Sequence, residues 1–327
     1  MSPEGIRPLS ARELQMKHPD RPEISVVIPA HNEAASIGDI VKRSSIVLEA
    51  CKLSHEIIVV DDGSEDDTGE NARSVGAEVI RHPYPIGNGA AVKTGIRNTR
   101  GNILVMLDAD GQHAPEDIPR LLERMNAYDM AVGSRDRHSA TPLHRDFANA
   151  VYNKFASYVC KRKIDDLTSG FRAIKAVIAR EFVSLLPNTF SYPTTLTLAV
   201  VRSGYSLTYV PITTARRIGK SKIRLFRDGA RFLLILLKIA TLFSPMRVFL
   251  PVSFFMFAAG LGYGLFRILT LDGRYGPTSA MLLTMSVVVF MVGLVSEQVA
   301  QLRYERTDHR SPPRQQHNTG KEQTHEP

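Results

Sequence analysis

The sequence has few cysteines and no apolar segment at its start, and each absence excludes a class of protein. Only two of the 327 residues are cysteines, Cys51 and Cys160, and they lack the spacing of zinc ligands. A disulfide-stabilised secreted scaffold is therefore excluded, and reduced thiols in a cytosolic domain are expected. The first 23 residues are polar and contain several prolines, so we predict no signal peptide and a folded domain on the cytosolic side.

Acidic residues are scarce between Arg202 and Arg247. This stretch contains ten lysines or arginines and a single acid, Asp228, in a chain whose net charge is +8. Such a block fits a nucleic-acid patch, a solvated face or a surface that faces anionic lipid. Because it directly precedes an apolar segment, we favour lipid, where each basic residue contributes on the order of 1 kcal/mol. We expect no nucleic-acid partner.

Charged residues are nearly absent from 248–300. Residues 248–269 form an apolar run of 22 with one charge, Arg267, and residues 279–296 form an uncharged run of 18. Both approach the roughly 20 residues that cross ~30 Å of hydrocarbon. Basic residues lie on the outer flanks, so the positive-inside rule predicts an integral membrane protein with two transmembrane helices and both termini in the cytosol. Two buried core helices are the alternative.

The segments around this pair differ in character. Residues 1–22 are a polar extension, 23–228 are the expected catalytic domain, and 301–327 are a polar tail expected to be disordered and cytosolic. Residues 229–247 are too short and too basic to span a bilayer, and they fit an amphipathic helix in the interface. A core helix is the alternative there. The transmembrane pair also offers a surface for a homo-oligomer.

Strand and helix patterns alternate through residues 23–228. The apolar runs EISVVIPA, HEIIVV, AEVIRH, NILVMLD and YSLTYVPI are typical of strands, and helical spacing separates them. This alternation predicts an α/β fold with a mainly parallel sheet. Residues 142–186 read as mainly helical, interrupted by a loop at DLTSGFRA. Ligands of such sheets bind beyond the carboxyl ends of the strands, where VIPA, VVDDGS and MLDAD all end.

The stretch DADGQH, residues 108–113, has an unusual density of side-chain oxygens. A calcium-binding EF-hand loop is excluded, because its sixth position is His113 and its twelfth is Pro119. A phosphohydrolase nucleophile requires a hydroxyl residue where Gln112 stands. A surface turn is disfavoured, because alternate acids beyond a buried strand repel unless a cation lies between them. The pattern therefore predicts a site for Mg²⁺ or Mn²⁺ that receives a phosphorylated ligand.

Seven stretches in one order carry a family resemblance. SVVIPAHNEAASI, EIIVVDDGSEDDT, GNGAAVKTGI, ILVMLDADGQHAPEDI, VGSR, TSGFR and RRIGKSK resemble the family 2 glycosyltransferases of the GT-A fold, a Rossmann-like fold. They are most similar to the polyprenyl-phosphate glycosyltransferases, of which dolichol-phosphate mannosyltransferase is the best-known member. The resemblance covers residues 23–225. It implies a membrane-bound inverting enzyme that moves a sugar from a GDP- or UDP-sugar to a polyprenyl phosphate.

The resemblance also implies roles for single residues. Asp108, Asp110 and Gln112 match the motif that holds the metal on the nucleotide diphosphate. Arg135 matches a diphosphate ligand, and His31 stands where tyrosine is common. The implied catalytic residues are Asp110, Arg135 and Asp166, and those near the acceptor phosphate are Ser169, Ser221 and Lys222. The implied nucleotide-sugar contacts are Pro29, Ala30, His31, Glu33, Asp61, Asp62, Lys93, Asp108, Ala109, Asp110, Arg135 and Arg216. For Arg216, Ser221 and Lys222, a membrane-surface patch is the alternative.

The acceptor decides whether a general base is required. A lipid phosphate is already ionised at neutral pH, whereas a hydroxyl acceptor would need a base, for which Asp165 or Asp166 is the candidate. Both aspartates also fit a structural role. In many relatives the helix after Phe190 carries an acid, and here Thr194, Thr195 and Thr197 occupy that stretch. The donor sugar is therefore left open, and these threonines can equally be packing residues.

Three other functions compete with this interpretation. Processive polysaccharide synthases use a Gln-x-x-Arg-Trp motif, and this sequence has no tryptophan. A transferase with a soluble acceptor would leave the two apolar segments without a purpose. A non-catalytic binding module would be expected to have lost the metal ligands, which are present.

Overall fold

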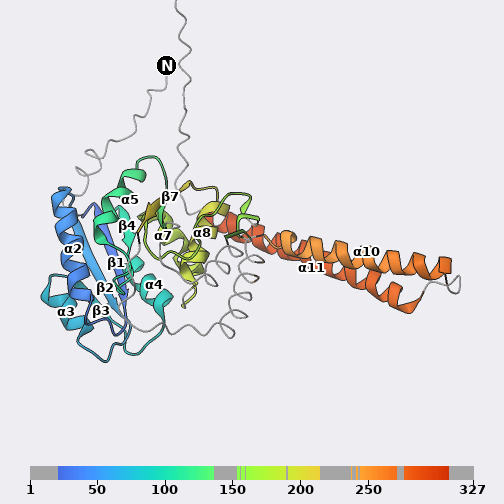
Figure 1. The fold of residues 1–327 in the computed structure, drawn as a ribbon, viewed down its shortest axis with the longest axis horizontal. Coiled ribbons are helices and arrows are strands. Elements are labelled where there is room, and N and C mark those ends of the chain that lie inside the picture. Colours follow the sequence, from blue (N-terminus) through green and yellow to red (C-terminus); the bar gives the residue numbers. More distant parts are fainter. Residues whose placement is uncertain are drawn as a thin grey trace, which may run out of the picture.

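A seven-stranded β-sheet forms the centre of the N-terminal α/β domain in this computed structural model (Figure 1). The structure describes residues 21–135, 153–154, 156–158, 160–188, 191–213, 237, 241, 244–270 and 276–308. The strand order across the described sheet is β3-β2-β1-β4-β6-β5-β7. The strands are β1 (Ile24–Ala30), β2 (His55–Asp61), β3 (Glu78–Arg81), β4 (Ile103–Met106), β5 (Met130–Arg135), β6 (Arg172–Lys175) and β7 (Leu207–Ile212).

Helices cover both faces of the sheet. One face packs against α2 (Ile37–Ala50), α3 (Thr68–Ser74) and α5 (Ile118–Arg124), and the other packs against α4 (Asn88–Asn98), α7 (Ala176–Phe182) and α8 (Tyr192–Arg202). The 3-10 turns η1 (Pro115–Asp117) and η2 (Val183–Leu185) lie before α5 and after α7. Because helices cover both faces, the central strands are apolar on both sides, and every residue of β1 is buried. The parallel α/β prediction is confirmed.

The strand β6 departs from the sequence prediction, in which Arg172 and Ala173 belonged to a loop and Ile174 and Lys175 to the helical segment after it. It runs antiparallel between β4 and β5, whereas β1–β4 are mutually parallel and β5 is parallel to β7. Its Ala173 and Ile174 are fully buried against opposite helical layers. Four residues carry too short an alternation to be recognised as a strand, and it is the two neighbouring strands that fix their register. Residues 142–152 of the segment expected to be helical lie outside the described residues.

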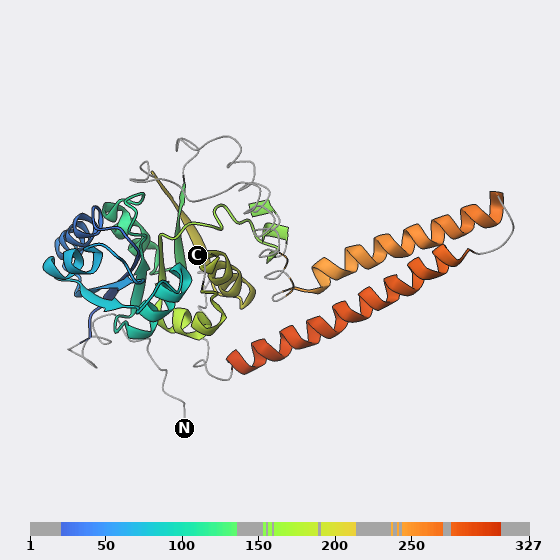
Figure 2. The ribbon, with the colours of Figure 1, turned by 90° about the horizontal axis from the view of Figure 1, so that it is seen from below.

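Two long apolar helices extend away from the sheet as a hairpin (Figures 1 and 2). They are α10 (Met246–Thr270) and α11 (Pro277–Asp308), and both contain stretches long and apolar enough to be candidate membrane spans. A helix of 25 residues such as α10 is about 38 Å long, which exceeds the ~30 Å of a bilayer core. Most of their large apolar side chains are exposed, including Phe254 at 70% and Phe255 at 75%. These are therefore not core helices of the sheet domain.

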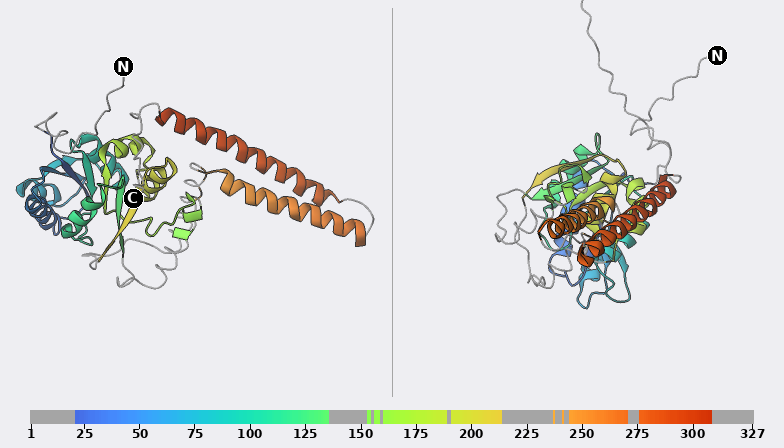
Figure 3. Two further views of the ribbon diagram at one scale, coloured as in Figure 1. Left: turned by 90° about the horizontal axis from the view of Figure 1, so that it is seen from above. Right: turned by 90° about the vertical axis from the view of Figure 1, so that its right-hand side faces the viewer.

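Small residues line the contact between the two hairpin helices. The buried residues of α10 are Ser253, Gly260 and Gly264. A Cβ at Gly260 would lie 2.9 Å from Cβ of Leu282, so the two backbones can approach only because that side chain is absent. The end-on view in Figure 3 shows the two helices side by side. Helix α11 continues to Asp308, into the part of the chain expected to be a tail, and no proline or glycine lies between Gly293 and Pro312 to interrupt it.

At the end of the hairpin nearest the sheet domain, hydrogen bonds join α10 to α11 and join α10 to the sheet domain. The backbone N–H of Met246 donates to Oε2 of Glu297 at 3.2 Å, so a carboxylate from α11 satisfies the first turn of α10. The guanidinium of Arg247 donates to the backbone carbonyl of Tyr158. The expected amphipathic segment 229–247 lies largely outside the described residues.

Candidate active site

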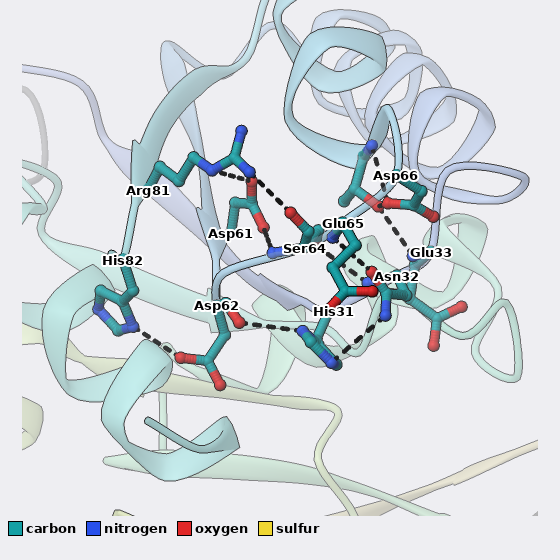
Figure 4. A network of polar contacts seen from close by, with 11 residues as sticks. His31, Asn32, Glu33, Asp61, Asp62, Ser64, Glu65, Asp66, Arg81 and His82 are labelled. Carbon is teal, nitrogen blue, oxygen red and sulfur yellow. Dashed lines mark hydrogen bonds and ion pairs between the residues drawn. The ribbon is translucent and has the colours of Figure 1, made fainter. Parts of the chain in front are cut away.

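The loops that follow β1 and β2 are hydrogen-bonded to each other (Figure 4). The Asn32 backbone N–H donates to Oγ of Ser64 at 3.0 Å, and its side-chain oxygen accepts the Glu65 N–H at 2.9 Å. Nδ1 of His31 lies 2.9 Å from the Asp62 carbonyl oxygen. Asn32 has a φ of 56°, which asparagine tolerates better than most residues. Two strand tips that are far apart in sequence are therefore held as one rigid edge.

Asp61 ends β2 and is fully buried. Its Oδ1 accepts the Ser64 N–H at 2.8 Å. Its Oδ2 makes no hydrogen bond and lies 3.5 Å from Nε of Arg81. Nη2 of the same arginine donates to the Ser64 carbonyl at 2.7 Å. A buried carboxylate oxygen with an ion pair but no hydrogen bond keeps the capacity to accept a donor from a ligand.

Asp62 serves a different purpose from its neighbour. It accepts backbone N–H groups from Ile86 at 2.9 Å and Gly87 at 2.8 Å, and a ring nitrogen of His82 lies 2.7 Å from its Oδ1. Burial raises the pKa of the Asp62 carboxyl, but these three hydrogen bonds outweigh that effect and leave the pKa below its ordinary value. The other ring nitrogen of His82 lies 2.9 Å from the Thr94 hydroxyl. Asp62 thus holds the loop that leads into α4.

The acidic turn, residues 108–113, follows β4 at the same edge of the sheet. Asp108, Asp110 and Gln112 are all half-buried, and the Gln112 N–H donates to Oδ1 of Asp110 at 3.1 Å. The buried hydroxyl of Ser36 donates to the Ala109 carbonyl at 2.6 Å, between the two aspartates. The buried ring of His113 stacks on Phe171 with centroids 5.4 Å apart. The turn is thereby fixed from both sides, with carboxylate and amide oxygens on one short segment.

A second loop, residues 165–171, packs directly on the acidic turn. Oδ1 of Asp166 accepts the backbone N–H groups of Thr168 at 2.9 Å and Ser169 at 3.1 Å, which fold this loop back on itself. Gly170 then lies against the carboxylate of Asp108, where a Cβ would be only 2.7 Å from Cγ. The two loops are in contact because residue 170 has no side chain.

Arg172, the first residue of β6, is fully buried. Its guanidinium donates to the Pro193 carbonyl at 3.0 Å, to the Thr197 hydroxyl at 3.2 Å and to the Ser169 carbonyl. Burial lowers the pKa of Arg172, while the tyrosines Tyr192 and Tyr209 and the acids Asp166 and Asp108 act in the opposite direction. A guanidinium with so high an intrinsic pKa stays charged, so a full positive charge lies beneath the acidic turn.

The threonines of α8 are packing residues. Thr194, Thr195 and Thr197 are all buried. The Thr195 hydroxyl donates to the Ser191 carbonyl at 3.1 Å, and the Thr197 hydroxyl accepts from Arg172. The stretch for which the family resemblance implied an acid is therefore occupied by neutral hydroxyls bonded to the protein itself.

Comparison with known proteins identifies the family. The profile of glycosyl transferase family 2 matches residues 25–182, and that of the GtrB C-terminal hairpin matches residues 244–302. The polyprenol monophosphomannose synthase of Mycolicibacterium smegmatis is 34% identical over 215 residues, which are 61% of this chain and 80% of that protein. The chain belongs to glycosyl transferase family 2.

Other relatives agree with that assignment. The dolichol-phosphate mannosyltransferase of Pyrococcus furiosus is 34% identical over 62% of this chain and 59% of its own length. Glucosyl-3-phosphoglycerate synthase from Mycobacterium tuberculosis, solved with Mn²⁺, UDP and phosphoglyceric acid, superposes with a TM-score of 0.55 at 21% identity, over 72% of this chain and 84% of that one. This second likeness shows the GT-A fold. The protein is thus a glycosyltransferase with a GT-A domain.

Most residues singled out from this glycosyltransferase's sequence lie at one edge of its sheet. Pro29, Ala30, His31, Asp61 and Asp62 end β1 and β2 or follow them directly, Glu33 and the acidic turn lie beyond the strand ends, and Arg135 ends β5. Lys93 is placed otherwise, in the middle of α4. Its ammonium donates to the side-chain oxygen of Asn188, which follows η2, and burial together with repulsion from Arg97 lowers its pKa. Ser169 lies in the loop that packs on the acidic turn. Arg216, Ser221 and Lys222 lie outside the described residues.

Three residues at the site escaped the sequence analysis. Ser36, Gly170 and Arg172 each act on the acidic turn or the loop beside it. Gly170 and Arg172 were visible in TSGFR only as members of a motif, and their contact with Asp108 and α8 depends on the antiparallel placement of β6. The one available signal for Ser36 was its position as the residue before α2, where serine commonly caps a helix. Here its hydroxyl bonds the acidic turn instead.

Proposed function

We propose that this glycosyltransferase is a membrane-bound inverting enzyme that transfers a sugar from a GDP- or UDP-sugar to a polyprenyl phosphate. The observation that carries the proposal is an oxygen-rich turn at the ligand-binding edge of a GT-A sheet whose chain continues into a hairpin of two candidate membrane spans. The named relatives include polyprenyl-phosphate transferases for mannose and for 4-deoxy-4-formamido-L-arabinose. The chemistry of the acceptor is supported by these names and by the hairpin together.

The donor side is supported by the chemistry of the donor atoms. Asp108, Asp110 and Gln112 offer two carboxylates and an amide oxygen, which suits Mg²⁺ or Mn²⁺. The described residues contain no cluster of three acidic, histidine or cysteine ligands, so the remaining coordination positions would be filled by the diphosphate and water. Such a site fits a metal that arrives with its nucleotide. When bound, the metal would act as a Lewis acid on the leaving diphosphate.

The nucleotide would lie along the two strand tips that Figure 4 shows. Oδ2 of Asp61 would accept an N–H from the base, because it is the buried acceptor without a hydrogen bond. Pro29, Ala30, His31 and Glu33 would shape the first turn of this pocket. Asp62 would contribute by holding the loop before α4. Arg135 and Arg216 would neutralise the diphosphate, and Ala109 would approach it through its backbone. Lys93, in the middle of α4, would be the remaining contact to the nucleotide sugar.

On the acceptor side, positive charge that holds the phosphate matters more than a general base. A polyprenyl phosphate is ionised at neutral pH and can attack the anomeric carbon without losing a proton to the protein. Ser169, Ser221 and Lys222 would hold that phosphate. Asp166 already accepts the N–H groups of its own loop, and this supports its role as the organiser of the loop rather than as a base. In-line attack opposite the diphosphate would invert the sugar configuration.

The membrane placement follows from the same proposal. Residues 248–300 would form the anchor, with the catalytic domain and both termini in the cytosol, because basic residues flank the hairpin on the side of the sheet domain. The bond between Arg247 and Tyr158 would keep the sheet domain against the membrane surface.

An assay of sugar transfer to a polyprenyl phosphate tests the proposal. The purified full chain in detergent is incubated with Mg²⁺ or Mn²⁺, a panel of radiolabelled GDP- and UDP-sugars, and undecaprenyl or dolichyl phosphate. We expect one donor to label the lipid phase. Label found only on added soluble glycans would favour a soluble-acceptor transferase, and long products would favour a processive synthase. Failure of every donor to label lipid would overturn the proposal.

A variant of the acidic turn tests the metal. Asp110→Asn removes one carboxylate while keeping its size, and we expect transfer to fall by roughly 100-fold or more. Melting temperature and detergent extraction should match the unaltered protein. Undiminished turnover in this variant would exclude the acidic turn as the metal site.

A further inference from the structure

Arg172 is the one fully buried arginine side chain among the described residues, and its direct partners are all neutral. They are the Ser169 and Pro193 carbonyls and the Thr197 hydroxyl. No described carboxylate forms an ion pair with the guanidinium. Neutral acceptors bond its two terminal nitrogens, its Nε makes no hydrogen bond, and its charge stays in place. That charge must therefore be balanced by groups slightly further away.

The acids that balance this charge belong to the acidic turn and to the loop beside it. Arg172 pairs with Met106 across the β4–β6 ladder, and Asp108 follows Met106 by two residues. Gly170, two residues before Arg172, packs on the Asp108 carboxylate. Asp166 and Asp108 are the two acids whose charge acts on the guanidinium. The described residues of α8, which touch Arg172, contain no acid at all.

We propose that Arg172 is a built-in counter-charge of the acidic turn, which offsets Asp108 so that a divalent cation binds the turn weakly by itself and tightly only together with a nucleotide diphosphate. The inference rests on the proposed metal site. The same buried charge attracts the anionic diphosphate and repels the cation, so it favours joint arrival and joint release of the two. Arg172 is a positioning residue in this scheme and does not touch the reacting atoms.

Thr197 offers a test that keeps the arginine in place. Its hydroxyl lies 3.2 Å from a guanidinium nitrogen of Arg172, so Thr197→Asp would put a carboxylate against that charge and neutralise it. Thr197→Asn adds the same bulk without a charge and is the matched control. Mn²⁺ affinity is measured by electron paramagnetic resonance without nucleotide, and GDP and UDP affinity by calorimetry without metal.

The counter-charge predicts shifts of opposite sign. For Thr197→Asp we expect the Kd for Mn²⁺ to fall by roughly tenfold and the Kd for the nucleotide diphosphate to rise by a similar factor. Thr197→Asn should leave both within about twofold of the original protein. Simple damage to the site would weaken both ligands, so weakening of both, or no change in either, would overturn the inference.

Arg172→Met removes the charge directly and should shift the two affinities in the same directions as Thr197→Asp. In this background Thr197→Asp should have no further effect, because the charge that it neutralises is gone; an undiminished effect would overturn the inference. If Arg172→Met does not fold, the Thr197 pair still decides the question. Absence of Mn²⁺ binding by the unaltered protein, even with saturating nucleotide, would instead refute the proposed metal site.

Discussion

The loop that contains Gly170 packs so closely on the acidic turn that no space remains for a methyl group at this residue. Gly170→Ala is therefore the sharpest steric test of the site. The new Cβ would lie 2.7 Å from Cγ and 2.9 Å from Oδ1 of Asp108, and closer still to its Oδ2. Carbon atoms in contact are normally about 3.5–4.0 Å apart, so the carboxylate would have to move by at least about 1 Å. No unusual backbone angle is required at this glycine, so the effect should come from this clash alone.

A displacement of this size has a predictable cost. A shift of 1 Å in a catalytic group lowers activity by roughly 100-fold, and forcing a methyl group into a packed site destabilises a fold by about 1–3 kcal/mol. We therefore expect Gly170→Ala to lower kcat/KM by roughly 100-fold and to weaken Mn²⁺ binding in the presence of nucleotide, with a smaller fall in melting temperature.

The assay is sugar transfer together with Mn²⁺ titration, both on the full chain in detergent. Gly38→Ala is the matched control, because a Cβ at that helical position would meet no atom within 4 Å. The control should keep full activity. If Gly170→Ala binds Mn²⁺ and transfers sugar as well as the control does, the carboxylate of Asp108 does not need its observed position.

Three further predictions follow from other contacts. Ser36→Ala should lower Mn²⁺ affinity and activity by roughly tenfold, because it removes the hydrogen bond that holds the acidic turn. Ser44→Ala in α2 removes a buried hydroxyl without a hydrogen-bond partner and should preserve both, so equal effects of the two variants would contradict the role of the Ser36 hydrogen bond. The pKa of Asp62 is lowered in the folded protein, so its stabilising effect is full above its unfolded pKa of about 4 and is lost as pH falls through the lower pKa of the folded state. Asp62→Asn should therefore melt at a lower temperature at pH 7, with the difference shrinking as pH falls below about 4, and a difference independent of pH would refute this. Gly260→Leu should separate the hairpin helices and lower the melting temperature in detergent. Gly262→Leu is the control, because a Cβ at Gly262 would meet no atom within 4 Å, and it should leave the melting temperature unchanged. Unchanged melting of both variants would argue against close packing of the helices at Gly260.

The sequence predicted the elements whose pattern is long. The β1 and β2 strands are seven residues each and apolar on both faces, which is enough to predict buried parallel strands and the edge at which they end. The two hairpin helices were predicted from the near absence of charged residues in their sequence. The family resemblance was confirmed by the matched profile, since it depends on motifs that are contiguous in sequence.

The short antiparallel strand was not predictable in the same way. Arg172–Lys175 has four residues, and its charged first and last positions resemble a loop. Only the ladders with β4 and β5 make it a strand, and only that placement buries Arg172 below the acidic turn. A charged residue that reads as exposed in sequence thus became the most buried cation described.

The sequence by itself determined the fold class, the family, the two candidate membrane spans and the oxygen-rich character of the turn at residues 108–113, because these depend on patterns local to the chain. Tertiary structure alone decided how that turn is held. The Ser36 hydroxyl bonds its backbone, the Gly170 backbone abuts its first carboxylate, and the Arg172 charge lies beneath it. Such contacts join residues more than 60 positions apart, and their distances depend on strand register, which no local pattern encodes.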